Sequence, residues 1–201
     1  MEANMAHIVK STNPGELNGI SAKTNDIHFG KLYTGYVNKR NEVEEKLSKI
    51  ESADLDSANQ VYSMYRGLKD GETFAANGMI LHEVFFDILG GEGKPGGKLF
   101  DDIVAEWDSW ENFEAIFMAS GMAARGWAIL AFDPSDEKLH IYQADAQNQG
   151  GVWGAIPLIT LDVYEHAYMI DFGADRKAYI AAFMQNLNWD KINTRYEKIS
   201  K

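Results

Sequence analysis

The sequence predicts an α+β protein in which an N-terminal α-helical hairpin domain is followed by a C-terminal domain with a small three-stranded antiparallel sheet flanked by helices. Three observations predict this class. Helical apolar spacing dominates the first half, three short strand-like runs occur in the second half, and the glycine-rich residues 90–97 separate the two. We therefore place the domains at residues 1–91, of which 1–20 form an irregular lead-in, and at residues 92–201.

The first half carries the signals of helices joined by short connections. Residues 1–20 are polar and contain Gly, Asn and Pro, which favours an irregular segment. Ser21 offers an N-cap for a helix over residues 22–50, which ends in a charged, solvated face. Two further helices are expected over residues 59–68 and 72–89.

The second half mixes helices with a sheet. Three runs rich in β-branched or aromatic residues predict strands over residues 127–132, 139–144 and 155–161, with a turn after the first. Helices are expected on both sides of these strands, over residues 98–107, 109–124, 164–170, 175–187 and 189–199.

Composition restricts the classes of function. The 201 residues include no cysteine, which excludes disulfides, thiolate metal sites and cysteine nucleophiles. The net charge of −11 argues against nucleic-acid and anionic-membrane partners. No apolar run reaches the ~18 residues of a membrane span, and the first residues lack a signal-peptide layout, so we expect a cytoplasmic protein. His7 and His140 are expected to be ordinary surface histidines.

Asp162 and His166 form a candidate metal-ligand pair at the end of the last predicted strand. Their spacing of four lets both side chains reach a common point, although such pairs also occur as surface salt bridges and helix caps. His28 and His82 lie on or beside apolar helix faces. Together the four residues supply three imidazoles and one carboxylate, which suit Mn, Fe, Co or Zn better than Ca or Mg. Spacing alone leaves open whether they converge.

Several segments resemble the iron/manganese superoxide dismutase family, from about residue 19 to the C-terminus. Residues 162–168 are similar to the family's D-x-W-E-H-A-Y signature, with Tyr164 in the Trp place. Residues 28–37 resemble its H-x-x-K-H-H-x-x-Y-V segment, and His82 falls where the family has its helical ligand. The likeness extends, in the expected order, to residues 90–99, 126–128, 156–158 and 188–190.

The resemblance implies a superoxide dismutase in which His28, His82, Asp162 and His166 bind one Mn or Fe ion per subunit, with a solvent molecule completing a five-coordinate site. It implies that Tyr36 is a phenol that gates the substrate channel and that the Gln147 amide contacts the bound solvent. Trp127 would form a wall of the pocket, and Tyr168 would line the channel. Lys31 and Arg176 would be the cations that attract superoxide.

The resemblance also bears on the metal and the assembly. Gln147 and Gly78 both match manganese-type members, which favours Mn over Fe. Glu165 would reach across a homodimer interface to the other subunit's ligand histidine, so a homodimer through the Glu165/His166 region is expected, with a tetramer as the alternative.

Departures from the family pattern surround the expected pocket. Leu32 stands where a channel histidine is usual, other positions replace Trp or His, and Arg125 takes a small-residue place. The replaced aromatic and imidazole positions are Phe29, Tyr33, Phe86, Ile129 and Tyr164. Two alternatives to a dismutase therefore stay open at this point. One is a dismutase-like metal-binding protein with impaired or altered activity because of Leu32, Phe86 and Tyr164, and the other is a non-haem iron oxygenase.

Overall fold

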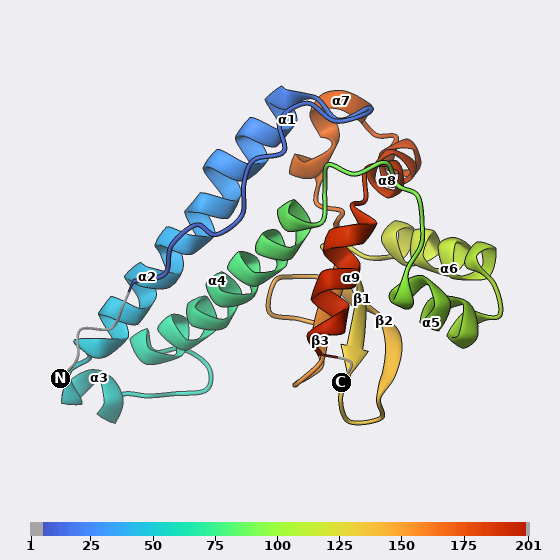
Figure 1. Ribbon diagram of the computed structural model, residues 1–201. Helices are drawn as coiled ribbons and strands as arrows, with labels where there is room; N and C mark the ends of the chain where they lie inside the picture. Colours follow the sequence, from blue (N-terminus) through green and yellow to red (C-terminus); the bar gives the residue numbers. More distant parts are fainter. Residues whose placement is uncertain (1–5, 200–201) are drawn as a thin grey trace.

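The computed structural model describes residues 6–199, which form a helical hairpin and a body built on a small sheet (Figure 1). The hairpin extends from the body, and its two long arms lie side by side. The predicted α+β class, with the helical hairpin first and the sheet second, is confirmed. In this part of the chain no helix has the length and apolar character needed to cross a membrane.

The first arm of the hairpin runs through α1 (Ala22–Ile27), one π-helical turn η1 (His28–Tyr33) and α2 (Thr34–Ser48). Its start is as predicted, because the Ser21 hydroxyl accepts a hydrogen bond from the Thr24 amide. The π turn was not predicted. Such turns shift the side chains that follow them around the helix, and they occur frequently at functional sites.

The second arm is one helix, α4 (Met64–Asp87), so the prediction of separate helices over residues 59–68 and 72–89 is wrong. The Ser63 hydroxyl caps its first turn, and packing of α4 against α2 holds the glycines inside it in a helix that their propensity alone would disfavour. A short helix, α3 (Ser52–Asp56), belongs to the connection between the two arms and was also not predicted.

The described sheet is antiparallel, with the order β2–β1–β3. Its strands are β1 (Trp127–Asp133), β2 (Lys138–Ala144) and β3 (Ile156–Asp162), close to the predicted ranges. The helices around them are α5 (Lys98–Trp107), α6 (Trp110–Ala123), the 3-10 turn η2 (Glu165–Ala167), α7 (Met169–Phe172), α8 (Arg176–Gln185) and α9 (Trp189–Glu197). The helix predicted over 164–170 is thus divided between η2 and α7.

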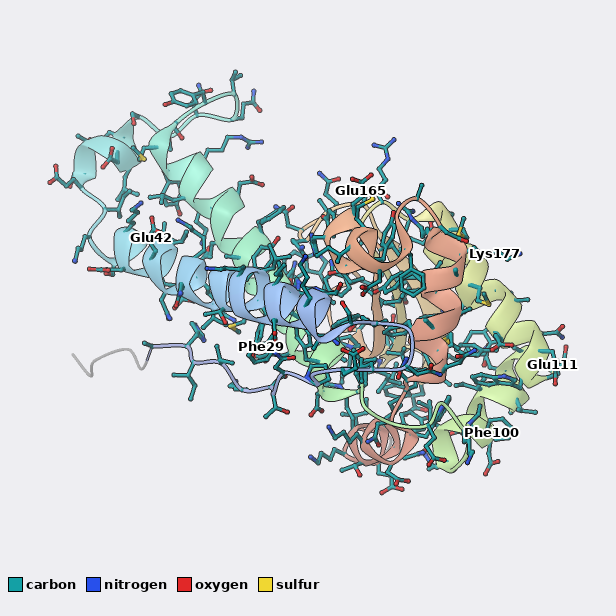
Figure 2. The ribbon with its side chains drawn as sticks, turned by 90° about the horizontal axis from the view of Figure 1, so that it is seen from above. Phe29, Glu42, Phe100, Glu111, Glu165 and Lys177 are labelled. Carbon is teal, nitrogen blue, oxygen red and sulfur yellow. The ribbon has the colours of Figure 1, made fainter. Side chains whose placement is uncertain are left out.

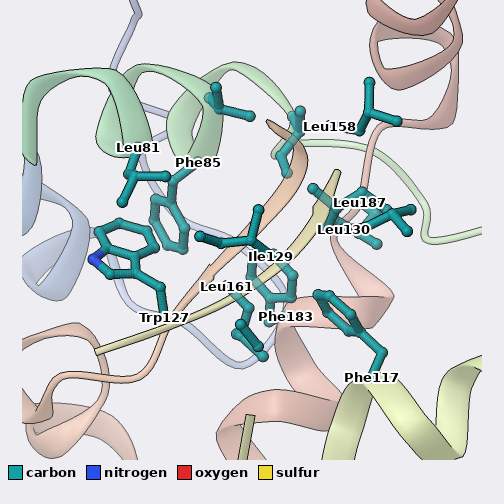
Figure 3. Packing of buried hydrophobic residues seen from close by; sticks show 14 of the residues in the cluster. Leu81, Phe85, Phe117, Trp127, Ile129, Leu130, Leu158, Leu161, Phe183 and Leu187 are labelled. Carbon is teal, nitrogen blue, oxygen red and sulfur yellow. The ribbon is translucent and has the colours of Figure 1, made fainter. Parts of the chain in front are cut away.

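One hydrophobic core joins the hairpin to the sheet. Every residue of β1 is buried, and Figure 3 shows side chains of α4, such as Leu81 and Phe85, packed beside Trp127 and Leu161. The Thr160 hydroxyl of β3 donates a hydrogen bond of 3.0 Å to the backbone carbonyl of Leu81. This bond fixes α4 along β3. It thereby fixes the position of His82, the next residue of α4, relative to Asp162 at the end of the strand.

The glycine-rich connection after α4 is held against the chain between α8 and α9. The Gly91 amide donates to the Asn186 carbonyl, and the Asn188 amide donates to the Ile88 carbonyl. A domain boundary between residues 91 and 92 stays a prediction, because this connection is packed closely on the second half. Within the lead-in, residues 6–20 contain no helix or strand. His7 in this segment hydrogen-bonds to Glu44, so this part of the lead-in lies against α2.

Substituting Gly91 with Ala should lower the free energy of unfolding by about 1–3 kcal/mol, because a methyl group there would lie 2.3 Å from the Leu187 carbonyl oxygen. Gly96→Ala is the matched control, since its methyl group would have nothing within 4 Å. Its stability should stay within about 0.5 kcal/mol of the parent. Urea unfolding measures both, and equal stability of the two variants would contradict the close packing described.

Candidate metal centre

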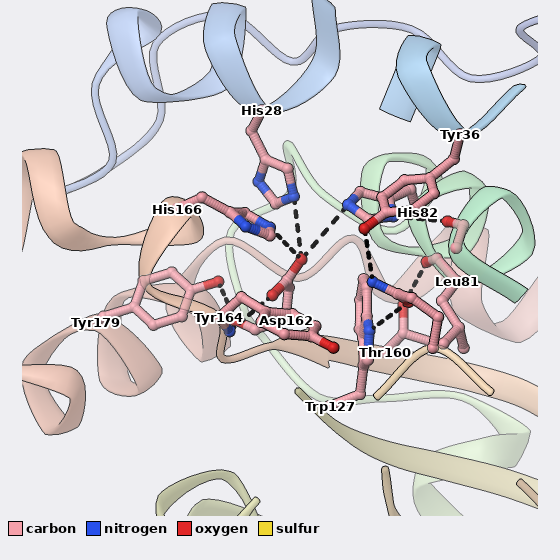
Figure 4. Close-up of polar contacts among 12 residues, drawn as sticks. His28, Tyr36, Leu81, His82, Trp127, Thr160, Asp162, Tyr164, His166 and Tyr179 are labelled. Carbon is pink, nitrogen blue, oxygen red and sulfur yellow. Dashed lines mark hydrogen bonds and ion pairs between the residues drawn. The ribbon is translucent and has the colours of Figure 1, made fainter. Parts of the chain in front are cut away.

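Four side chains from separate segments converge where the hairpin meets the sheet (Figure 4). His28 opens η1, His82 lies in α4, Asp162 ends β3 and His166 lies in η2. Their candidate ligand atoms all lie within 4.8 Å of one another. His28, His82 and Asp162 are buried and His166 is half-buried. The convergence that the spacing left open is therefore a property of the fold.

The end of β3 and the turn after it determine the positions of the Asp162 and His166 side chains. The Asp162 backbone carbonyl accepts a 2.8 Å hydrogen bond from the Tyr179 hydroxyl. Its Oδ1 accepts from the Tyr164 amide at 2.9 Å, a local bond that turns the chain from the strand into η2. Because Oδ1 is engaged in this way, Oδ2 is the oxygen that faces the three imidazoles.

Asp162 Oδ2 lies 3.1 Å from His28 Nε2, 3.1 Å from His166 Nε2 and 3.5 Å from His82 Nε2. The His82 Nδ1 lies 2.6 Å from the Gly78 carbonyl oxygen, which can only accept, so Nδ1 carries the proton and Nε2 presents a lone pair. Among residues 6–199, His82 Nε2 has no hydrogen-bond partner. A lone pair that faces a carboxylate oxygen in a buried site is costly without compensation, and a bound cation would compensate both groups.

The distances fit a metal ion. Two ligand atoms at about 2.1 Å from one ion lie about 3.0–3.4 Å apart when the angle between them is near 90–109°. The observed separations of 3.1, 3.1 and 3.5 Å from Asp162 Oδ2 are close to this range. Imidazole nitrogens with one carboxylate oxygen are ligands for Mn, Fe, Co or Zn, as expected from the residue types.

Burial and mutual charge prepare these groups for cation binding. Burial lowers the pKa of His28, and it lowers that of His82 to about 3, so both rings are neutral ligands at neutral pH. Burial alone would raise the pKa of Asp162, but His166 and His28 hold it well below its usual range. Burial opposes the charge of His166, yet Asp162 raises its pKa. At a pH where His166 is protonated, metal uptake would displace that proton.

Aromatic rings enclose His28 and keep water from it. The ring centroids of Phe85 and Phe86 lie 4.9 and 5.0 Å from that of His28. Phe86 also contacts Phe29 and Tyr33, so three of the residues that depart from the family pattern form one packed wall. The low dielectric of this wall strengthens the interaction of Asp162 with any bound cation.

A second chain of contacts connects the sheet to the hairpin beside His82. The Trp127 indole, which is a donor only, donates from Nε1 to Gln147 Oε1 at 2.9 Å. This fixes the Gln147 amide so that its Nε2 donates to the Tyr36 hydroxyl oxygen at 3.2 Å. The β1–β3 register pairs Trp127 with Asp162, which places the indole next to the ligand set. Its ring also meets that of His82 edge-on at 5.0 Å.

Gly78 makes room for the Tyr36 ring. A methyl group at Gly78 would lie 2.5 Å from Tyr36 Cδ1. The same residue supplies the carbonyl that accepts from His82 Nδ1. Gly78 therefore supports a candidate ligand, His82, through its backbone carbonyl, and it leaves space for the Tyr36 ring because it has no side chain.

The outer side of His166 opens onto a surface pocket of about 510 Å³, whose lining includes Tyr164, Glu165, Arg125 and Arg176. Tyr164 stacks on the His166 ring at 5.3 Å, and Glu165 is exposed. The Arg176 Nε donates to the Tyr168 hydroxyl and its Nη1 donates to the Ala124 carbonyl. Figure 2 shows Glu165 at the surface of the body, away from the far end of the hairpin.

Some residues singled out from the sequence lie apart from this arrangement. Lys31 is exposed on η1 and does not line the pocket, and Leu32 is half-buried beside it. Ile129 is a core residue of β1. Tyr179 and Thr160, which hold the strand that carries Asp162, were not identified from the sequence. They carry no local signal, because each acts through a backbone carbonyl of a residue distant in sequence.

Two family models match most of the chain. The alpha-hairpin domain of iron/manganese superoxide dismutases matches residues 17–90, and the C-terminal domain of the same enzymes matches residues 95–195. The Aquifex pyrophilus protein named superoxide dismutase [Fe] is 44% identical over 94% of this chain and 89% of its own length.

Other similar proteins carry names with either metal. The Cupriavidus metallidurans superoxide dismutase [Fe] is 38% identical over 91% of this chain and 91% of its own. The Halobacterium salinarum superoxide dismutase [Mn] 1 is 34% identical over 87% of this chain and 85% of its own. The names therefore divide between iron and manganese.

Gly78→Ala should lower the free energy of unfolding by about 1–3 kcal/mol, because the added methyl group must displace the Tyr36 ring. Gly71→Ala on the same helix is the control, since its methyl group would lie 3.7 Å from Val43 Cγ2, an ordinary contact. It should be neutral or stabilising by up to about 1 kcal/mol. Urea unfolding of the metal-free proteins distinguishes the two, and a stable Gly78→Ala variant would argue against the crowding.

Proposed function

This chain belongs to the iron/manganese superoxide dismutase family, and from that premise we propose that His28, His82, Asp162 and His166 hold its single redox ion. The enzyme is an oxidoreductase that acts on superoxide. The observation that carries the ligand assignment is the buried carboxylate oxygen facing the lone pair of His82 at 3.5 Å. The binding of one Fe or Mn ion is compatible with this donor set.

The reaction converts two superoxide ions and two protons into dioxygen and hydrogen peroxide. The four candidate ligands would hold a Mn or Fe ion, which would supply the one-electron redox chemistry of both half-reactions. The protein supplies the ligands, the exclusion of water and the protons. The buried ring wall and the indole of Trp127 keep bulk water from the ligand side of the site.

Tyr36 and Gln147 are the catalytic pair of this proposal. The Gln147 amide donates to the Tyr36 oxygen, so the phenol's own hydrogen is free to be donated to a substrate oxygen. Burial raises the pKa of Tyr36, against the opposing effect of the Gln147 hydrogen bond. The phenol therefore keeps its proton at neutral pH and can donate it to the reduced product.

Manganese is the ion that we propose for this chain. The resemblance matches Gln147 and Gly78 to manganese-type members. The Gln147 amide hydrogen-bonds with Trp127 and Tyr36, and Gly78 brings no side-chain amide to the same site. Because similar proteins are named for both metals, the choice must be argued from these residues. Oxidation of the ion is coupled to hydrogen bonding around it, so the position of Gln147 tunes the potential.

Superoxide must approach a protein whose net charge is −11, and we propose that Lys31 and Arg176 draw it in locally. Lys31 is exposed on the hairpin side, and Arg176 lines the pocket beside His166. The Tyr168 hydroxyl accepts a hydrogen bond from Arg176, and we propose Tyr168 as a channel residue on this side. Cations near an entrance raise the local concentration of an anion even where the overall field repels it.

We propose a homodimer through the Glu165/His166 region, with a tetramer as the alternative. Glu165 is exposed beside the open side of His166, and it would reach the ligand histidine of the other subunit. The exposed Met122, Met169 and Ile170 supply apolar surface in the same part of the chain. Apolar patches of this kind mark interfaces between proteins.

The two alternative functions have no supporting observation. A third imidazole close to the carboxylate disfavours the two-histidine site of a non-haem iron oxygenase. A dismutase-like protein with impaired or altered activity would owe this to Leu32, Phe86 and Tyr164, of which Phe86 and Tyr164 pack against His28 and His166. A cytoplasmic location stays a prediction.

Metal-free protein reconstituted with Mn should consume superoxide faster per bound ion than protein reconstituted with Fe. His166→Ala should abolish turnover and most of the bound metal, because it removes one of the four ligands. The control is His7→Ala, which removes a surface imidazole paired with Glu44. Stopped-flow decay of superoxide, with metal analysis of each sample, gives the result. A fully metallated parent without turnover would refute the dismutase function, and a faster Fe form would refute the manganese assignment alone.

Glu165→Ala should shift the protein toward monomer at a given concentration, because a carboxylate is lost from the proposed interface. Light scattering across a dilution series measures the mass. Glu111→Ala, on α6 and away from the pocket (Figure 2), serves as the control. A Glu165→Ala protein with the same mass as the parent at every concentration would place the interface elsewhere.

A further inference from the structure

The turn between β1 and β2 carries a second group of metal-ligand side chains, Asp133, Asp136 and His140. The β1–β2 register pairs Asp133 with Lys138 and Ala131 with His140, so Asp133 and His140 lie on the same face, diagonally across the hairpin. The group lies at the opposite end of β1 from Trp127. Six residues of strand separate it from the redox centre by about 20 Å.

The three side chains present their ligand atoms to one another. The candidate atoms lie within 4.8 Å, and His140 Nε2 lies 2.9 Å from Asp136 Oδ2. That separation suits two ligands at right angles around an ion at about 2.1 Å. Asp133 is buried, whereas Asp136 is exposed and His140 is half-buried, so an ion can enter from solvent.

Neighbouring groups hold these ligands in place. The Tyr142 ring stacks on His140 with centroids 5.4 Å apart, and its hydroxyl donates to Asp133 Oδ2 at 3.1 Å. The Ser135 amide donates to the other oxygen, Asp133 Oδ1, at 2.9 Å. Hydrogen bonds to the ligating groups orient them and lower the cost of ordering them on binding.

We propose that Asp133, Asp136 and His140 form a surface site for a divalent cation of the zinc class. One imidazole with two carboxylates leaves coordination positions for water, and this donor set suits Zn²⁺ better than Ca²⁺ or Mg²⁺, which prefer oxygen ligands alone. His140, which was expected from the sequence to be an ordinary surface histidine, is thus proposed as a metal ligand. The inference does not depend on the proposed redox function, because none of its residues belongs to that centre.

The competing explanation is a simple ion pair of His140 with Asp136 at the hairpin turn. The chain contains a matched case of such a pair. His7 Nε2 lies 2.9 Å from Glu44 Oε1, and this pair belongs to no described group of three metal-ligand residues. His7 is therefore the control for an imidazole that meets one carboxylate and binds no ion.

The test uses enzyme whose redox centre is already loaded with Mn, titrated with Zn²⁺ in a calorimeter, with Mn retention measured afterwards. We expect a zinc site in the parent and in His7→Ala. Its affinity should fall by more than about tenfold in His140→Ala and in Asp133→Asn, as expected when a metal site loses a ligand. The melting temperature should rise with Zn²⁺ in the parent but not in these two variants.

Two outcomes would overturn the proposal. One is the absence of a zinc site in the Mn-loaded parent at millimolar Zn²⁺. The other is binding of equal affinity in the parent, His140→Ala and Asp133→Asn. Superoxide turnover of the Mn-loaded variants should match that of the parent, which separates failure of this proposal from failure of the redox assignment. If one substitution impairs folding, Asp136→Asn removes a ligand from the exposed side of the site.

Discussion

The structure depends on one buried carboxylate. Asp162 is fully enclosed, and its Oδ2 faces three imidazole nitrogens. Burying an ionised group without compensation is very costly. The fold offsets that cost locally with the Tyr164 amide on Oδ1 and with the positive charge that Asp162 promotes on His166. A metal ion would complete the compensation. The carboxylate lies at the junction of β3, α4 and η1, so the candidate site exists only when the hairpin is docked on the sheet.

Outside the candidate ligands, the same junction holds the groups that we propose to move protons. The indole of Trp127 orients the Gln147 amide, and that amide orients the Tyr36 phenol. Each bond has a fixed donor, because indole can only donate and the amide oxygen can only accept. These hydrogen bonds run from the sheet to the first arm of the hairpin, while Gly78 on the second arm provides the space for the Tyr36 phenol.

Much of this could be predicted from the sequence, and the remainder depends on packing between distant segments. The strands, the Ser21 cap and the glycine-rich connection follow from local patterns. The π turn of η1 does not, since nothing in its residues distinguishes it from an α-helical turn. The continuity of α4 through Gly67 and Gly71 was missed because its packing on α2 outweighs their low helix propensity. The ligand set was predictable as residue types, but its convergence needed the fold. Tyr179 and the Asp133–His140 group were missed because strand register and a long-range backbone contact bring their atoms together.

The wide separation of the ligands along the chain has a kinetic meaning. His28 and Asp162 lie 134 residues apart, and the atoms that face each other come together only when the hairpin has closed onto the sheet. We therefore expect the candidate ligand set to come together late in folding, with the long-range contacts that are slowest to form. The ring wall closes the site on the His28 side, whereas the half-buried His166 faces the surface pocket. Because the other three candidate ligands are buried, we expect ion exchange to be slow, so that the ion present during folding is largely retained by the mature enzyme.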